Sequence, residues 1–179
     1  MPEIEIRPAV ISDIPVLMAL DHFYQTNYVW QMDRTIEDGQ VIIRFREVRL
    51  PRLVRVEYPN SGGWLAEGWK QQPALLVAVL AGEPVGYICL TETLSAGTAW
   101  VKELVVREKL RHKGIATALL LAAQDWAGQR RYRRIILEMQ SKNNPAIRMA
   151  QKVGCEFCGY NDHYYANQDI ALFFARYLR

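Results

Sequence analysis

One strand-to-helix transition constrains the fold of this 179-residue chain more than any other segment. The apolar run 98–106 predicts a buried strand, and a short polar loop follows it. The loop ends at Lys113-Gly114-Ile115-Ala116, where the spacing of apolar side chains changes to that of a helix reaching about residue 126. A buried strand that passes directly into such a helix is typical of a sheet covered by helices.

The other segments extend this pattern to a mixed α/β fold. The turn residues 81–84 join two apolar runs and predict an antiparallel hairpin. Asn144 is the expected N-cap of a helix with Pro145 at its first position. Strands are predicted at 4–6, 74–80, 85–93, 98–106, 134–139, 156–165 and 169–178, and helices at 14–23, 114–126 and 145–152. This order predicts a mixed sheet with helices on both faces.

Residues 27–72 are harder to interpret. Asp38-Gly39 predicts a turn before a strand-like run at 41–45, the segment 52–63 reads as a loop, and a short helix is expected at 64–69. Because no linker divides the chain, we expect a single domain, residues 1–179, with an irregular insert at about 27–72.

Composition excludes several classes of protein. The 22 basic and 19 acidic residues give a formal net charge of +3, which is too small to indicate nucleic-acid binding by itself. The spacing Cys155-x-x-Cys158 lacks a second cysteine or histidine pair, so we expect packing residues and no metal. Neither a signal peptide nor a membrane-spanning run is present, so a cytoplasmic location without a membrane or nucleic-acid partner is expected.

The loop before the long helix suits an anion. The first turn of a helix has unpaired N–H groups and a partial positive charge, which favour a group such as pyrophosphate. Gly114 lets the backbone approach that ligand, and Arg111, His112 and Lys113 add positive charge. A glycine in a strand-to-helix loop also occurs in many unrelated folds. The loop is neither a Rossmann nor a Walker motif.

Two stretches resemble motifs of one known family. The run from Leu104 to Leu120, with Arg111-His112-Lys113-Gly114-Ile115-Ala116 at its centre, resembles the acetyl-CoA-binding motif of the GNAT superfamily of N-acetyltransferases, Arg/Gln-x-x-Gly-x-Gly/Ala. The stretch from Leu137 to Gly154 is similar to that superfamily's next motif. The resemblance covers residues 74–179 well and residues 3–25 weakly. It implies a GNAT-like central mixed sheet, mostly antiparallel with a parallel splayed pair, and acetyl transfer to a primary amine.

The resemblance also implies a cofactor site. Backbone groups of Leu104 and Val106 would pair with the pantetheine arm of acetyl-CoA like an added strand. On chemical grounds, the amide of Leu104 or Val105 could donate to the reacting carbonyl oxygen. The amides of Arg111, His112, Lys113, Gly114, Ile115 and Ala116 would hold the pyrophosphate. Asn143, near the start of the next helix, would contact the cofactor.

The chemistry needs a base, because a free amine is mostly protonated at neutral pH. Glu138 and Glu103 are the candidates, alone or together. Many family members protonate the leaving thiolate with a tyrosine four residues after the motif alanine, but Ala146 plus four is Ala150 here. Tyr160 is a possible substitute, as are residues 163–165. The departure also leaves open a second reading, a CoA-binding regulatory module without turnover.

The acceptor is the least determined part. The run 163–169 resembles the hairpin of peptide N-terminal acetyltransferases, in which a tyrosine pair contacts the peptide, so Tyr164 and Tyr165 are expected at the substrate. Tyr28 is either a pocket residue or part of the core. The acceptor is a peptide N-terminus or a small-molecule amine. The basic insert disfavours a cationic antibiotic or polyamine, which needs an acidic pocket. The sequence leaves a homodimer open.

Overall fold

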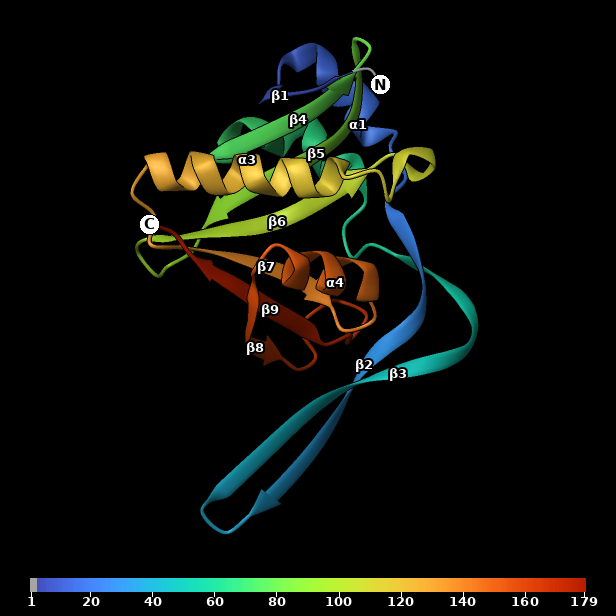
Figure 1. The fold of residues 1–179 in the computed structure, drawn as a ribbon, viewed down its shortest axis with the longest axis vertical. Coiled ribbons are helices and arrows are strands. Elements are labelled where there is room, and N and C mark those ends of the chain that lie inside the picture. The colour runs from blue at the N-terminus through green and yellow to red at the C-terminus, as the bar shows by residue number, and fades with distance from the viewer. Residues whose placement is uncertain (1–2) are drawn as a thin grey trace.

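The computed structural model describes residues 3–179 and contains a seven-stranded sheet (Figure 1). The strand order is β1-β4-β5-β6-β7-β9-β8. Only β6 and β7 are parallel, and every other neighbouring pair is antiparallel. The strands are β1 (Ile4–Pro8), β4 (Ala74–Leu80), β5 (Glu83–Glu92), β6 (Thr98–Val106), β7 (Arg134–Gln140), β8 (Glu156–Asn161) and β9 (Ala171–Tyr177). The expected mixed sheet with one parallel pair is therefore confirmed.

Helices cover both faces of the sheet, as predicted. On one face, α3 (Ile115–Gln129) and α4 (Asn144–Lys152) pack on the larger apolar core (Figure 1). On the other face, α1 (Ile14–Met18) and α2 (Leu65–Gly68) cover a smaller core that includes Tyr87 and Val105. The two faces therefore have separate hydrophobic clusters, and the two predicted strands 74–80 and 98–106 have the predicted bounds.

The insert is regular rather than irregular, so that prediction is wrong. Residues of this region form a long antiparallel hairpin of β2 (Phe23–Glu37) and β3 (Gln40–Glu57), with the predicted turn at Asp38-Gly39. Figure 1 shows the hairpin as an arm that extends away from the sheet. Because most of its side chains are exposed on both faces, the arm lacks the apolar alternation by which strands are identified from sequence. The short helical segment predicted at 64–69 is present as α2 and its flanking turns.

Aromatic packing anchors the base of the arm. The Trp30 ring lies 5.7 Å from that of Phe174, and the Phe45 ring lies 5.5 Å from that of Phe157. The backbone N–H of Trp30 donates to Ser141 O at 2.9 Å. A two-stranded hairpin is marginal alone, so these contacts fix the direction in which the arm leaves the domain.

Several element ends differ from the predictions for local reasons. The first helix ends at Met18, and Phe23 instead begins β2. The N-cap of α4 is Asn143, not Asn144, because the Asn143 side chain accepts a hydrogen bond from the Ala146 amide. The two closing strands are shorter than expected, and residues 162–170 between them form turns and coil.

Three further expectations concern membrane-spanning helices, metal sites and the cysteines. Among residues 3–179 no helix is long and apolar enough to cross a membrane. In the same range, no group of three or more His, Cys, Asp or Glu side chains is placed to hold a metal ion. Cys155 is buried as a packing residue, whereas Cys158 is exposed, which corrects the prediction that both pack inside.

Candidate active site

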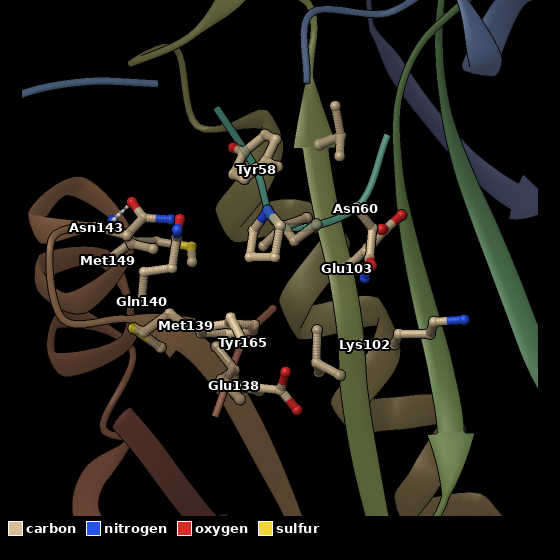
Figure 2. A pocket seen from close by; sticks show the side chains of 16 residues that line it. Tyr58, Asn60, Lys102, Glu103, Glu138, Met139, Gln140, Asn143, Met149 and Tyr165 are labelled. Carbon is tan, nitrogen blue, oxygen red and sulfur yellow. Dashed lines mark hydrogen bonds between the residues drawn. The ribbon is translucent and has the colours of Figure 1, made fainter. Parts of the chain in front are cut away.

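The parallel strands β6 and β7 separate partway along their length. They pair from Thr98–Val101 against Arg134–Leu137, and no ladder continues beyond that point. The gap between the diverging ends is lined by both strands, by the segment after β3 and by α4 (Figure 2). The side of β6 that faces this gap has backbone groups without a strand partner, which suits an extended ligand that pairs like an added strand.

A β-bulge in β6 sets which side chains face the gap. Glu103 pairs with Cys89 and Val101 pairs with Leu90, so Lys102 is the extra residue. The bulge reverses the alternation: Val101 and Leu104 both pack toward the α3–α4 face, while Glu103 lies on the α1–α2 face.

The cleft predicted to hold the cofactor, called the cofactor cleft below, lies where the N-terminal ends of α3 and α4 approach β6. Its lining includes Leu104, Val106, Arg111, His112, Gly114, Ile115 and Ala116. Gly114 has φ +86° and precedes α3 without a side-chain cap in residues 3–179, so the first amides of α3 are open to the cleft. His112 is also left-handed, at φ +61°, and such alternating turns form concave anion-binding backbones. The cleft can therefore hold a diphosphate.

The predicted basic residues of the loop differ in their placement. The Arg111 guanidinium donates to Val106 O at 2.9 Å and to Asp21 O at 2.6 Å. It therefore fixes the loop, while its backbone lines the cleft. Lys113 is exposed and is not part of the cleft lining. Val105 is buried in the α1–α2 core, so it offers only backbone groups to a ligand.

Asn143 lies at the junction of the cleft and the gap, and it lines both. Its Oδ1 accepts from the Ala146 amide at 3.2 Å, as the dashed line in Figure 2 marks. Asn143 therefore orients the start of α4 toward the cofactor cleft and lies at its edge.

Glu103 is a buried carboxylate beside the gap. Its Oε2 accepts hydrogen bonds from Tyr87 Oη at 2.7 Å and Trp64 Nε1 at 2.9 Å. Its Oε1 is buried and has no hydrogen-bond partner among residues 3–179. Burial raises the pKa of Glu103, and the two hydrogen bonds oppose that shift. A carboxylate with one free oxygen and increased proton affinity is suited to accept a proton.

Glu138 lies at the other end of the gap (Figure 2). Its Oε2 accepts from Trp100 Nε1 at 2.7 Å and from Tyr164 Oη at 3.0 Å. Burial and the nearby Glu138 raise the pKa of Tyr164 to about 12. Tyr165 lines both the gap and an outer opening that also includes Tyr164 and Glu138. The two tyrosines and this carboxylate thus form one acceptor-side opening.

Two predicted residues lie elsewhere. Tyr160 lies opposite Leu172 on β9, and Leu172 lies opposite Met139 on β7. The Tyr160 side chain therefore points to the α4 face, where its ring centroid lies 5.3 Å from that of Phe45. Tyr28 lies on β2, with the Arg148 guanidinium carbon 5.9 Å from its ring centroid. Neither lines the gap, the cleft or the acceptor-side opening. The structure therefore removes Tyr160 as a substitute proton donor.

Tyr58 is a site residue that sequence reasoning missed. It follows β3 and lines both the cofactor cleft and the gap, on the same side as Asn143 in Figure 2. Burial raises the pKa of Tyr58, so its hydroxyl keeps its proton. The position expected to carry a tyrosine, Ala150, is fully buried in the core. No local pattern identified Tyr58, because the path of the insert places it.

Comparisons with known proteins identify the family of this chain. A family model described as "Acetyltransferase (GNAT) family" matches residues 42–155. A streptothricin acetyltransferase of Streptomyces lavendulae is 31% identical over 167 residues, which are 90% of this chain and 86% of that protein.

Solved structures give the same fold. A nourseothricin acetyltransferase superposes with a TM-score of 0.83 at 21% identity, over 98% of this chain and 99% of that chain. A putative streptothricin acetyltransferase from Bacillus anthracis, in complex with acetyl coenzyme A, superposes with a TM-score of 0.77 at 17% identity, over 99% and 98% of the two chains.

Proposed function

The chain belongs to the GNAT family of acetyltransferases, and we propose that it transfers the acetyl group of acetyl-CoA to a primary amine of a streptothricin-type antibiotic. The observation that carries this proposal is a continuous path through the sheet. The cleft and the gap share Tyr58, Leu104, Asn143, Ala146 and Met149. The gap and the acceptor-side opening share Pro59, Asn60, Lys102, Glu138 and Tyr165. The donor and the acceptor can therefore enter from opposite faces and meet between β6 and β7.

The donor side fits acetyl-CoA. The open amides at the start of α3 bind the diphosphate, and the gap-facing backbone of β6 pairs with the amide-containing pantetheine arm. Acetyl-CoA supplies the acyl thioester. The backbone N–H of Leu104 or Val105 then donates to the carbonyl oxygen as negative charge develops there.

The acceptor amine needs to lose a proton, since its ammonium form has a pKa near ~10. Glu103 takes that proton on Oε1, the oxygen without a partner. Glu138 holds the acceptor ammonium at the outer opening, between the rings of Tyr164 and Trp100. The two candidate carboxylates thus have separate roles.

The leaving thiolate receives its proton from Tyr58, and the second proton that the acylated nitrogen loses restores the Tyr58 hydroxyl. Its hydroxyl is protonated, and the residue lies where the cleft joins the gap. A thiolate is a good leaving group, so this step contributes less to the rate than the base does. Tyr58 supplies the function that other family members place at the position of Ala150.

The charge distribution weakens the earlier objection to a cationic antibiotic. The arginines of the β2–β3 arm do not line the acceptor-side opening within residues 3–179, although Lys102 and Arg134 line it beside Glu138. Glu103 and Glu138 instead place two carboxylates along the path of the acceptor. This arrangement and the 31% identity to a streptothricin acetyltransferase support the same acceptor class.

Thiol release from acetyl-CoA tests the proposal. The purified protein should release CoA thiol when a streptothricin antibiotic is added, and mass spectrometry should show one acetyl group on the antibiotic. Peptides with free N-termini form the second arm, because the Tyr164–Tyr165 pair at the opening also suits a peptide backbone. Faster turnover with peptides would contradict the antibiotic proposal. Binding without thiol release from any amine would indicate the regulatory module.

A further inference from the structure

A line of hydrogen bonds runs from Glu103 away from the gap. Tyr87 Oη donates to Glu103 Oε2 at 2.7 Å, and His22 Nε2 lies 2.9 Å from the same hydroxyl. His22 Nδ1 lies 2.7 Å from Leu20 O. The three side chains come from β6, β5 and the segment before β2, so the chain is brought together only by the fold.

Counting hydrogens shows what this line can hold. A carbonyl oxygen only accepts, so His22 Nδ1 carries a hydrogen that it donates to Leu20 O. Two contacts remain, Glu103 to Tyr87 and Tyr87 to His22, and each needs one hydrogen. The Tyr87 hydroxyl provides one of them. The second sits either on His22 Nε2, as an imidazolium, or on Glu103 Oε2, as a neutral acid. The line therefore holds one ionisable proton that His22 and Glu103 share.

We propose that His22, acting through Tyr87, is a positioning residue that keeps Glu103 ionised and therefore able to act as the base. This inference rests on the role proposed above for Glu103. With the shared proton on His22, the buried carboxylate has a cationic partner two hydrogen bonds away and remains an acceptor. Without that partner, burial favours the neutral acid, which cannot take a proton from the substrate.

The surroundings of His22 fit this role. The histidine is only partly buried, so it can exchange its proton with solvent. A Cβ at Gly62 would lie 2.6 Å from His22 Cε1 and 2.9 Å from Met18 O, so the close backbone at Gly62 fixes the ring in place.

Charged and titratable groups surround this line on several elements, and Tyr58 and Cys89 lie near Tyr87 and Glu103. Tyr87 and Glu103 face His22 from the sheet. Asp21 precedes His22 and accepts from the Glu108 amide, while the Arg111 guanidinium binds the backbone oxygen of Asp21. Lys102 adds positive charge beside Glu103, where its Nζ lies over the Trp64 ring at 3.9 Å.

The kinetic test uses His22→Gln, which removes the cation, and Tyr87→Phe, which cuts the link. Both should lower kcat about tenfold at neutral pH. The acid limb of the kcat/KM profile should move about 1 to 2 pH units higher, because more alkaline conditions are then needed to ionise Glu103. The KM for acetyl-CoA should not change. Tyr132→Phe, which removes a surface hydroxyl bound to Glu92, is the control and should leave the profile unchanged.

A second readout needs no substrate. Infrared difference spectroscopy should show the Glu103 carboxyl protonated in His22→Gln at a pH at which it is ionised in the original protein, because the cationic partner is gone. The band is identified by its loss in Glu103→Gln. An unchanged band overturns the inference, whatever amine the enzyme accepts. A changed band with an unmoved acid limb also overturns it, and places the failure in the base role proposed for Glu103. A loss of kcat in both variants without any movement of the limb would indicate a merely structural contact.

Discussion

Replacing Gly114 with alanine separates cofactor binding from folding. Gly114 has φ +86°, and an added Cβ would meet no atom of the protein within 4 Å. The left-handed backbone costs an alanine about 1–2 kcal/mol, which lowers Tm by about 2–4 °C per kcal/mol in a chain of this size. The methyl group would stand in the cleft where the diphosphate approaches the α3 amides. Loss of one charge-assisted hydrogen bond, about 1.5–3 kcal/mol, predicts roughly 10- to 100-fold weaker acetyl-CoA binding.

Gly39 provides a matched control. It lies in the turn of the β2–β3 arm at φ +74°, and its Cβ would likewise meet nothing within 4 Å. Gly39→Ala should therefore lose similar stability and keep its affinity for acetyl-CoA. Calorimetric titration and thermal unfolding measure both quantities on both variants. Unchanged acetyl-CoA affinity in Gly114→Ala, or an equal loss in Gly39→Ala, would refute the reasoning that the α3 amides hold the diphosphate.

Other residues give independent predictions. Glu103→Gln should lower kcat by about 10²–10⁴-fold. Glu138→Gln should lower turnover and raise the acceptor KM roughly tenfold without changing the affinity for acetyl-CoA. Steady-state kinetics separates the two variants, and an unchanged rate would remove the substituted residue from the mechanism. Tyr58→Phe should lower kcat by up to about tenfold, because a thiolate leaves with little help; full activity would assign the proton to water. The Arg7 guanidinium lowers the pKa of buried Asp13, so Asp13→Asn should cost about 1–3 kcal/mol of unfolding free energy at neutral pH. The stabilisation by Asp13 is fully present above its unfolded pKa of about 3.9 and is lost as pH falls through its lower folded pKa. The unfolding free energies of the two proteins, measured in urea, should therefore converge as pH falls below about 3.9. A difference that stays constant with pH would contradict this prediction.

Local patterns were sufficient for the elements that line the cleft. The strands 74–80 and 98–106 have the predicted bounds, because their apolar runs and the adjacent turn residues determine both. The glycine before α3 also marked the start of the helix correctly. The order of these elements then predicted the mixed sheet, whereas its single parallel pair was implied by the family resemblance. From residue 74 onward, the spacing of apolar residues and the turn residues between them predict most of the strands and helices.

Other features depend on contacts between distant segments. The long β2–β3 arm has side chains exposed on both faces, so its sequence lacks the alternation that marks a half-buried strand. The bulge at Lys102 is set by pairing with β5, and it places Glu103 and Val101 on opposite faces of the sheet. Tyr58 reaches the site through the path of the insert, and His22 reaches it through the segment between α1 and β2. None of these placements follows from the residues adjacent in sequence.

A crystal structure with bound CoA tests the central claim most directly. The account predicts the diphosphate on the amides before α3, the pantetheine arm along the gap-facing edge of β6, and the sulfur between Tyr58 and Glu103. A cofactor bound with its sulfur outside the β6–β7 gap, or with its diphosphate away from Gly114, would contradict the account.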